Sequence, residues 1–144
     1  MRILQYAFSG DPTNHGLPHN YISNCVAYTG THDNDTTVGW FNSRAGAGSR
    51  RDASEIRREH DFCLKYLDTD GAEIHWDFIR AIWASVADTA IVPMQDLLGL
   101  DTESRMNLPA SGSANWSWRV KDGEITDELA ARLGELTRIY GRET

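Results

Sequence analysis

The sequence predicts an α/β fold in which short parallel strands are covered by helices. Short apolar runs alternate with longer segments whose apolar residues recur every three or four positions, the pattern of strands followed by amphipathic helices. The apolar runs are continuous, which is typical of strands buried on both faces of a sheet. Only three strand candidates are present, and three strands cannot close a barrel. The elements therefore form either a small open sheet or part of a larger structure.

Three apolar runs are the strand candidates. Residues 2–8 and residues 25–29 are each followed by a cluster of polar, glycine or proline residues, which indicates a turn. The third run, residues 90–94, follows the most regular helical segment. Between the first two runs, residues 13–20 are rich in glycine, proline, histidine and asparagine, and we predict a loop there.

The helical segments follow the second and third strand candidates. The most regular pattern spans residues 76–89, where apolar side chains repeat at three and four positions. A shorter helix is expected to begin at residue 36, with Thr36 or Asp35 as its N-cap. The remaining predictions are helices over residues 54–67 and 128–140, a turn or short helix over 95–100, and loops over 44–54 and 108–115.

Composition excludes several classes of protein. The formal net charge of −7 argues against a nucleic-acid partner, because such a surface needs a basic patch. No apolar run approaches the roughly 20 residues of a membrane span, and the first residues are too short an apolar stretch for a signal peptide. Only two cysteines, Cys25 and Cys63, are present, so we expect reduced thiols, packing in the interior, and a cytoplasmic location.

A dense polar cluster follows the second strand candidate. His32, Asp33, Asn34 and Asp35 come directly after an apolar run, and functional sites of parallel α/β folds are built at the carboxyl ends of strands. A carboxylate at this position can catalyse, bind a ligand or coordinate a metal ion. The same residues can instead cap the N-terminus of the following helix. The spacing matches no recognised metal motif, which disfavours the metal site.

Further candidates follow the third strand. Gln95 and Asp96 come directly after it, and they either point into the same site or cap the next turn. Arg105 and Asn107 carry a guanidinium and an amide that suit ligand hydroxyls, although Arg105 could equally pair with an acidic side chain. Two tryptophans, at positions 116 and 118, lie in a polar stretch and either pack or offer flat faces to a sugar ring. By contrast, Trp76 and Trp83 have helical spacing, which predicts a core position.

Four stretches resemble one family, the 4-alpha-glucanotransferases (amylomaltases or disproportionating enzymes). The longest, residues 27–37, contains the polar cluster after the second strand. The other stretches occur in the same order and are residues 4–8, 92–100, and 104–107 together with 115–119. The resemblance implies a (β/α)8 TIM barrel of the alpha-amylase type. Residues 1–144 would form the C-terminal part of its catalytic domain, about strands 6 to 8 with their helices, without a separate second domain.

The resemblance also implies an activity. Such enzymes transfer alpha-1,4-glucan segments between maltooligosaccharides by a retaining double displacement, in starch, glycogen or maltodextrin metabolism. By motif, Asp33 is the third catalytic carboxylate, which grips hydroxyls of the distorted sugar and is predicted to be ionised at neutral pH. His32 is its neighbour at the same sugar, and Asn107 is similar to a residue lining the acceptor side. Asn34, Gln95 and Asp96 are the remaining predicted substrate-binding residues, and neither a cofactor nor a metal is implied.

Two features depart from the family pattern. The nucleophile and the acid/base residue lie before its sixth strand, so we expect both to be absent here and the isolated chain to be inactive. Ala110 and Ala114 stand where the family usually has glycine, and alanine at a turn with positive φ costs stability. Two other functions remain open: an alpha-glucan hydrolase of the same superfamily, which would create reducing ends, and a non-catalytic module that binds glucan without turnover.

Overall fold

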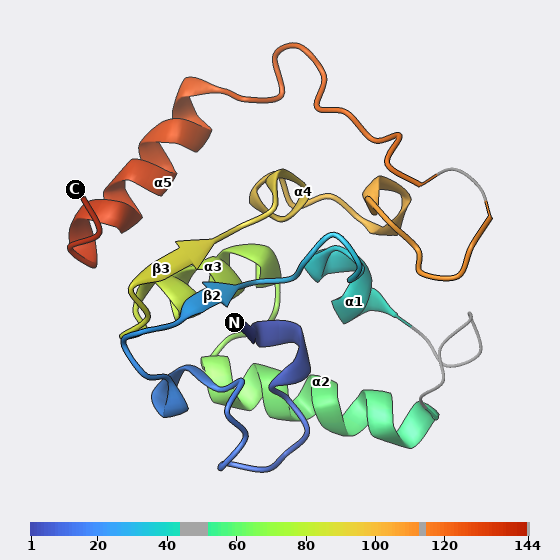
Figure 1. The fold of residues 1–144 in the computed structure, drawn as a ribbon, viewed down its shortest axis with the longest axis vertical. Helices are drawn as coiled ribbons and strands as arrows, with labels where there is room; N and C mark the ends of the chain where they lie inside the picture. Colours follow the sequence, from blue (N-terminus) through green and yellow to red (C-terminus); the bar gives the residue numbers. More distant parts are fainter. Residues whose placement is uncertain (44–51, 113–114, 144) are drawn as a thin grey trace.

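Three short parallel strands form the sheet of this protein. The computed structural model describes residues 1–43, 52–112 and 115–143. Its strands β1 (Arg2–Ile3), β2 (Val26–Tyr28) and β3 (Thr89–Ile91) lie in the order β1-β2-β3. All pairs are parallel, with Arg2 opposite Ala27 and Val26 opposite Thr89. The predicted α/β fold with parallel strands is confirmed (Figure 1).

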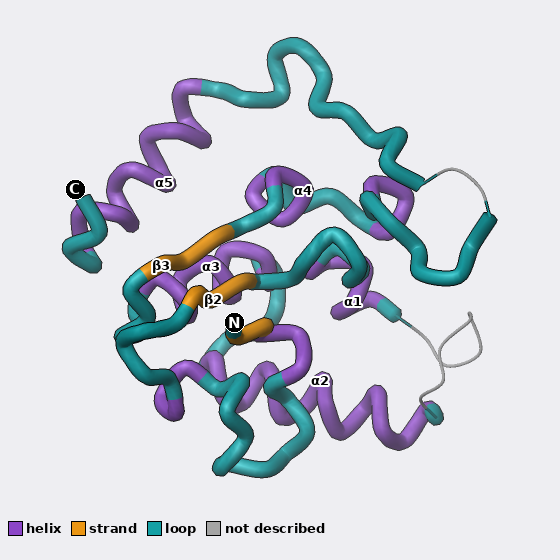
Figure 2. The backbone as a smooth tube through the Cα atoms, in the orientation of Figure 1, coloured by secondary structure: helices purple, strands orange, loops and turns teal. Residues whose placement is uncertain are grey.

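The helices follow β2 and β3, as the sequence predicted. Thr36 is the N-cap of the first helix, and its side chain accepts a hydrogen bond from the backbone of Gly39. Figure 2 shows that most of the chain between the fourth and fifth helices is loop. The α-helices are α1 (Thr37–Asn42), α2 (Ala53–Leu67), α3 (Ile74–Trp83), α4 (Met94–Leu97) and α5 (Asp127–Ile139), and three 3-10 turns span Leu4–Tyr6, Pro18–Asn20 and Thr102–Ser104.

Some predicted boundaries are wrong. The strand expected over residues 2–8 ends at Ile3, because the chain turns into a 3-10 helix that buries Leu4 while Gln5 still donates a backbone hydrogen bond to Thr29. The helix expected over 76–89 begins earlier and ends at Trp83. The strand expected over 90–94 is shorter, since α4 begins at Met94. Of the loop predicted over 44–54, residues 44–51 lie outside the described residues.

The core lies between the sheet and its helices, and α3 is its centre. This helix packs against α1, α2, α4 and α5, and both of its tryptophans, Trp76 and Trp83, are buried as predicted. Phe8 anchors an aromatic cluster in which its ring centroid lies 5.4 Å from Phe78 and 5.7 Å from Trp40. Both ring pairs are tilted, and aromatic contacts at such distances add to the free energy gained by burial. The core thus fixes the strand ends from which the polar loops emerge.

The two cysteines are free, as the sequence predicted. Cys63 is completely buried in α2, and Cys25 is half-buried beside β2. Burial raises the pKa of the Cys63 thiol to about 12. The thiol is therefore protonated at neutral pH and acts as a small packing group.

Candidate active site

The candidate site lies at the carboxyl ends of β2 and β3, where the loop after β2 meets the segment after β3, which contains α4 and a 3-10 turn; both segments are called loops of the site below. Residues 29–36 connect β2 to α1, and residues 92–107 follow β3. Neighbouring parallel strands end at the same edge of a sheet, so both loops lie on one side of the molecule (Figure 1). The predicted site residues come from these two loops.

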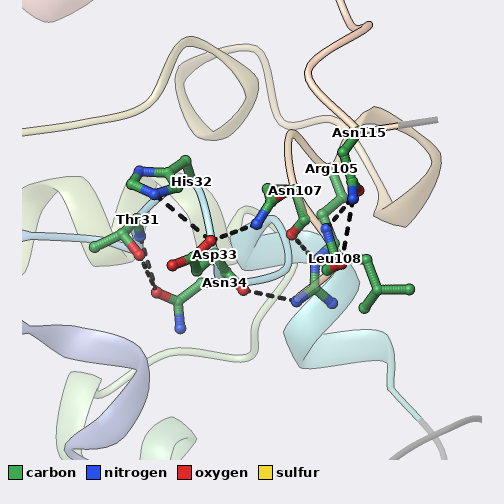
Figure 3. A network of polar contacts seen from close by, with 8 residues as sticks. All are labelled: Thr31, His32, Asp33, Asn34, Arg105, Asn107, Leu108 and Asn115. Carbon is green, nitrogen blue, oxygen red and sulfur yellow. Dashed lines mark hydrogen bonds and ion pairs between the residues drawn. The ribbon is translucent and has the colours of Figure 1, made fainter. Parts of the chain in front are cut away.

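Asp33 is held at the centre of the polar network shown in Figure 3. Its Oδ1 accepts a hydrogen bond of 2.6 Å from Nδ2 of Asn107 and lies 3.5 Å from Nε2 of His32. About half of the Asp33 side chain, 51%, is exposed. Asn107 also donates its backbone N–H to the carbonyl oxygen of His32, at 3.1 Å. The structure therefore brings His32, Asp33 and Asn107 together, although they come from different loops.

Arg105 joins the same two loops through backbone oxygens. Its Nη2 donates to the carbonyl oxygen of Asp33 at 2.7 Å, and its Nε donates to the carbonyl oxygen of Asn107 at 2.9 Å. The sequence suggested either a ligand contact or a pair with an acidic side chain. The observed arrangement is a third one, in which the guanidinium bridges two main-chain carbonyls.

Asn34 shapes the loop that carries Asp33. Its Oδ1 accepts hydrogen bonds from the backbone N–H of Thr31 at 3.0 Å and from the Thr31 hydroxyl at 2.7 Å. The residue is buried, and Figure 3 shows its side chain turned toward Thr31. The backbone N–H of Asn34 also donates to the carbonyl oxygen of Thr31 at 3.1 Å, so the two residues close a local turn.

Asp96 ties both ends of this loop to the segment after β3. One oxygen accepts a 2.5 Å hydrogen bond from the hydroxyl of Thr29, and the other accepts a 2.6 Å bond from the backbone N–H of Thr37. The residue is only 2% exposed, and burial raises the pKa of its carboxyl. Its neighbour Gln95 is also buried and donates to the carbonyl oxygen of Ser104 at 3.3 Å. Both side chains are engaged within the protein.

Two hollows flank the Asp33 loop. The larger is a groove of about 1020 Å³ whose wall includes Asp33, Trp40 and Ala110. The smaller, of about 190 Å³, is lined by His32, Gln95, Asp96 and other residues of both loops. Their shared walls include Asn34, Asp35 and Arg105. Asp33 therefore faces an open groove, while its neighbour His32 borders a smaller pocket.

Trp116 completes the smaller hollow, a role that sequence reasoning left open. Its ring centroid lies 4.9 Å from that of His32, and its backbone N–H donates to the carbonyl oxygen of Met106 at 2.7 Å. The residue is 54% exposed. The sequence did indicate that Trp116 could belong to the site, because it falls in one of the four stretches that resemble the family. What the sequence could not predict is that this distant segment reaches the end of β2.

The described residues offer no metal centre. Within residues 1–43, 52–112 and 115–143, no three His, Cys, Asp or Glu side chains are grouped to hold an ion. In the same stretches, none of the helices has the length and apolar character needed to cross a membrane.

A family model described as 4-alpha-glucanotransferase matches residues 1–126. The chain belongs to this family. The 4-alpha-glucanotransferase of Clostridium butyricum is 49% identical over 142 residues, which are 99% of this chain and 27% of that relative. A chloroplastic/amyloplastic 4-alpha-glucanotransferase of Arabidopsis thaliana is 42% identical over 146 residues and is covered over 23% of its length.

A solved structure shows the same arrangement of elements. The amylomaltase from Streptococcus agalactiae, in complex with acarbose, superposes with a TM-score of 0.85 at 34% identity. The match covers 100% of this chain and 27% of the amylomaltase. The chain thus spans about a quarter of the length of the relatives it matches. The cytoplasmic location stays a prediction, because the plant relative is described as chloroplastic/amyloplastic.

Proposed function

We propose that residues 1–144 supply about strands 6 to 8 of a (β/α)8 barrel, as the C-terminal part of its catalytic domain, with no second domain of their own. Three adjacent parallel strands in sequence order support this placement. It is also supported by a helix after each of β2 and β3, and by the superposition on an amylomaltase over 27% of its length. The polar loops then lie at the barrel face where TIM-barrel enzymes carry their active sites.

We further propose that the whole protein transfers alpha-1,4-glucan segments between maltooligosaccharides, and that Asp33 is its third catalytic carboxylate. One observation carries this assignment. Asp33 stands half exposed on the wall of the large groove, with Oδ1 held by Asn107. Among the described residues, no side chain or backbone group donates a hydrogen bond to its Oδ2. That oxygen can accept hydrogen bonds from sugar hydroxyls, and these strengthen as positive charge develops on the sugar ring.

The other predicted substrate-binding residues divide into two groups. His32 and Asn107 both contact Asp33, and we assign them to the same sugar and to the acceptor side respectively. Asn34, Gln95 and Asp96 line the smaller hollow, but hydrogen bonds within the protein engage their side chains. These three contribute through the shape of the pocket.

The double displacement needs two further carboxylates, a nucleophile and an acid/base. By the family resemblance, we expect both to precede the sixth strand and therefore to lie outside residues 1–144. We therefore expect the isolated polypeptide to leave maltotriose unchanged.

A grafted enzyme tests the proposal. In it, residues 1–144 replace the matching 27% of the Clostridium butyricum relative, which is 49% identical. The graft should convert maltotriose into glucose and longer oligomers without a rise in total reducing ends. Asp33→Asn should lower this rate by roughly 10²- to 10³-fold, as expected for the loss of one preorganised electrostatic contact to the transition state. Chromatography of the products and a reducing-end assay provide the measurements.

Asp70→Asn is the matched control, because Asp70 is exposed and accepts a hydrogen bond from Ala72 in the turn between α2 and α3. Its graft should retain the full rate. A steady rise in reducing ends would indicate a hydrolase and contradict the transfer activity. A folded Asp33→Asn graft with the full rate would remove Asp33 from the mechanism.

A further inference from the structure

Arg105 occupies a closed ring of hydrogen bonds that joins the two loops of the site. Its guanidinium contacts the carbonyl oxygens of Asp33 and Asn107 at 2.7 and 2.9 Å. Asn107 completes the ring, because its side chain donates to the Asp33 carboxylate at 2.6 Å. The backbone N–H of Asn107 adds a second hydrogen bond between the two loops, to the carbonyl oxygen of His32 at 3.1 Å. Each loop is thereby fixed to the other at the residue that carries a functional side chain (Figure 3).

The chemistry of arginine suits this bridge. A guanidinium is planar and presents its N–H donors in a fixed fork, so two acceptors are held at a set separation. Lysine has a compact ammonium on a flexible stem and does not reproduce that geometry. Arg105 is half-buried and borders both hollows, so its bonds form at the edge of the site. Asp96 holds the two ends of the Asp33 loop, whereas Arg105 and Asn107 hold its middle, at Asp33 itself and at His32.

We propose that Arg105 is a positioning residue for Asp33. This inference rests on the proposed function of Asp33. The fork fixes the backbone on both sides of the Asp33–Asn107 contact, which keeps Oδ1 paired with Asn107 and holds the Asp33 side chain on the wall of the groove. Arg105 needs no contact with the sugar in this role, and its effect on the reaction passes through Asp33.

The test uses the grafted enzyme with maltotriose. Arg105→Ala should lower kcat roughly 10- to 100-fold, since a displacement of about 1 Å in a catalytic group costs rates of that order. The KM should change less, because the contacts of Asp33 are strongest in the transition state. Arg105→Lys should recover only a minor part of the loss. In an Asp33→Asn background, Arg105→Ala should lower the remaining rate by less than about twofold, since coupled residues are not additive.

The matched control is Arg132→Ala, which also removes two arginine hydrogen bonds. Arg132 binds both carboxylate oxygens of Glu73 at 2.7 Å, between α5 and the start of α3. This variant should keep kcat within about twofold of the unmodified graft. A similar loss of kcat in Arg105→Ala and Arg132→Ala would overturn the positioning role. An equal loss of rate from Arg105→Ala in the unmodified graft and in the Asp33→Asn graft would overturn it as well.

Hydrogen exchange gives a readout that does not depend on activity. The backbone N–H of Asn107 is bonded to His32, so it should exchange slowly in the unmodified graft and in Arg132→Ala. In Arg105→Ala its protection should fall at least tenfold, because the segment loses its anchor. Unchanged protection would overturn the bridge. An inactive but folded graft would count against the proposed function alone, and the exchange result would still decide the role of Arg105.

Discussion

At the scale of single residues, the loop beside the groove contains backbone that is unfavourable for its side chains. Ala110 has φ of 64° and Trp116 has φ of 61°, both in the left-handed region. An L-residue with a Cβ pays roughly 1–2 kcal/mol there relative to the right-handed region. The sequence predicted this cost at Ala110, where the family usually has glycine, but not at Trp116. Ala114, the second such position, lies outside the described residues.

Replacement of Ala110 by glycine should stabilise the protein. Relief of the left-handed strain outweighs the larger entropy of glycine in the unfolded chain, so we expect a gain of about 0.5–1 kcal/mol. Ala131→Gly is the control, because Ala131 is exposed inside α5 and glycine costs about 1 kcal/mol in a helix interior. Thermal unfolding of the two grafted variants should shift in opposite directions. A decrease for Ala110→Gly as large as that for Ala131→Gly would contradict the argument.

At the scale of elements, the end of α3 depends on a residue close to the C-terminus. Arg142 donates Nε to the carbonyl of Trp83 at 2.6 Å and Nη1 to that of Ala87 at 3.0 Å. Its Nη2 contacts the carbonyls of Ile82 and Ser85. The last carbonyls of a helix lack partners within it, and a basic side chain can satisfy them. These four hydrogen bonds, called the Arg142 clasp below, lie where α3 ends at Trp83. The apolar pattern had predicted a helix that continues to residue 89.

Loss of this clasp should destabilise the protein measurably. Arg142→Gln removes a charged group that bonds four carbonyls, so we expect a loss of about 1.5–3 kcal/mol. Arg138→Gln is the comparison, because the Arg138 side chain forms an exposed ion pair of 3.5 Å with Glu143, a kind of contact typically worth about 0–1 kcal/mol. Urea unfolding of both grafted variants measures the difference. Equal midpoints would show that the clasp contributes nothing beyond a surface charge.

Local pattern thus predicted the existence of the elements better than their ends. The core positions of α3 follow from apolar periodicity, and the N-cap of α1 follows from Thr36 preceding an apolar run. The boundaries depend on partners elsewhere in the chain. Gln5, for example, leaves the strand geometry while its side chain donates to the carbonyl of Asp35 at 2.8 Å. A tertiary contact of this kind leaves no periodic signal in the sequence.

At the scale of the whole molecule, the same distinction applies to the candidate site. The position of Asp33 after a strand, together with the family motif, predicted a functional cluster at that edge of the sheet. The bridge made by Arg105 and the contact of Trp116 with His32 each join segments far apart in the sequence. From residue type alone, Arg105 and Trp116 each had two interpretations that were equally well supported. Only the parallel order of β2 and β3 brings their loops together.

The sheet itself leads to a last prediction. In the described part of the chain, β1 and β3 are both edge strands, and Ile91 of β3 is 42% exposed. Parallel strands are normally covered on both faces, and open edges leave backbone groups unpaired. The 144-residue polypeptide alone should therefore show weak near-UV circular dichroism and a broad melt. Co-expression with the Clostridium butyricum relative lacking the matched segment should produce a complex with a sharp melt and restored transfer of glucan segments, and Asp33→Asn should lower this rate as it does in the graft. A sharp, cooperative melt of the polypeptide alone would mean that the three strands and their helices fold stably on their own. The open strand edges would then no longer support the placement in a larger barrel.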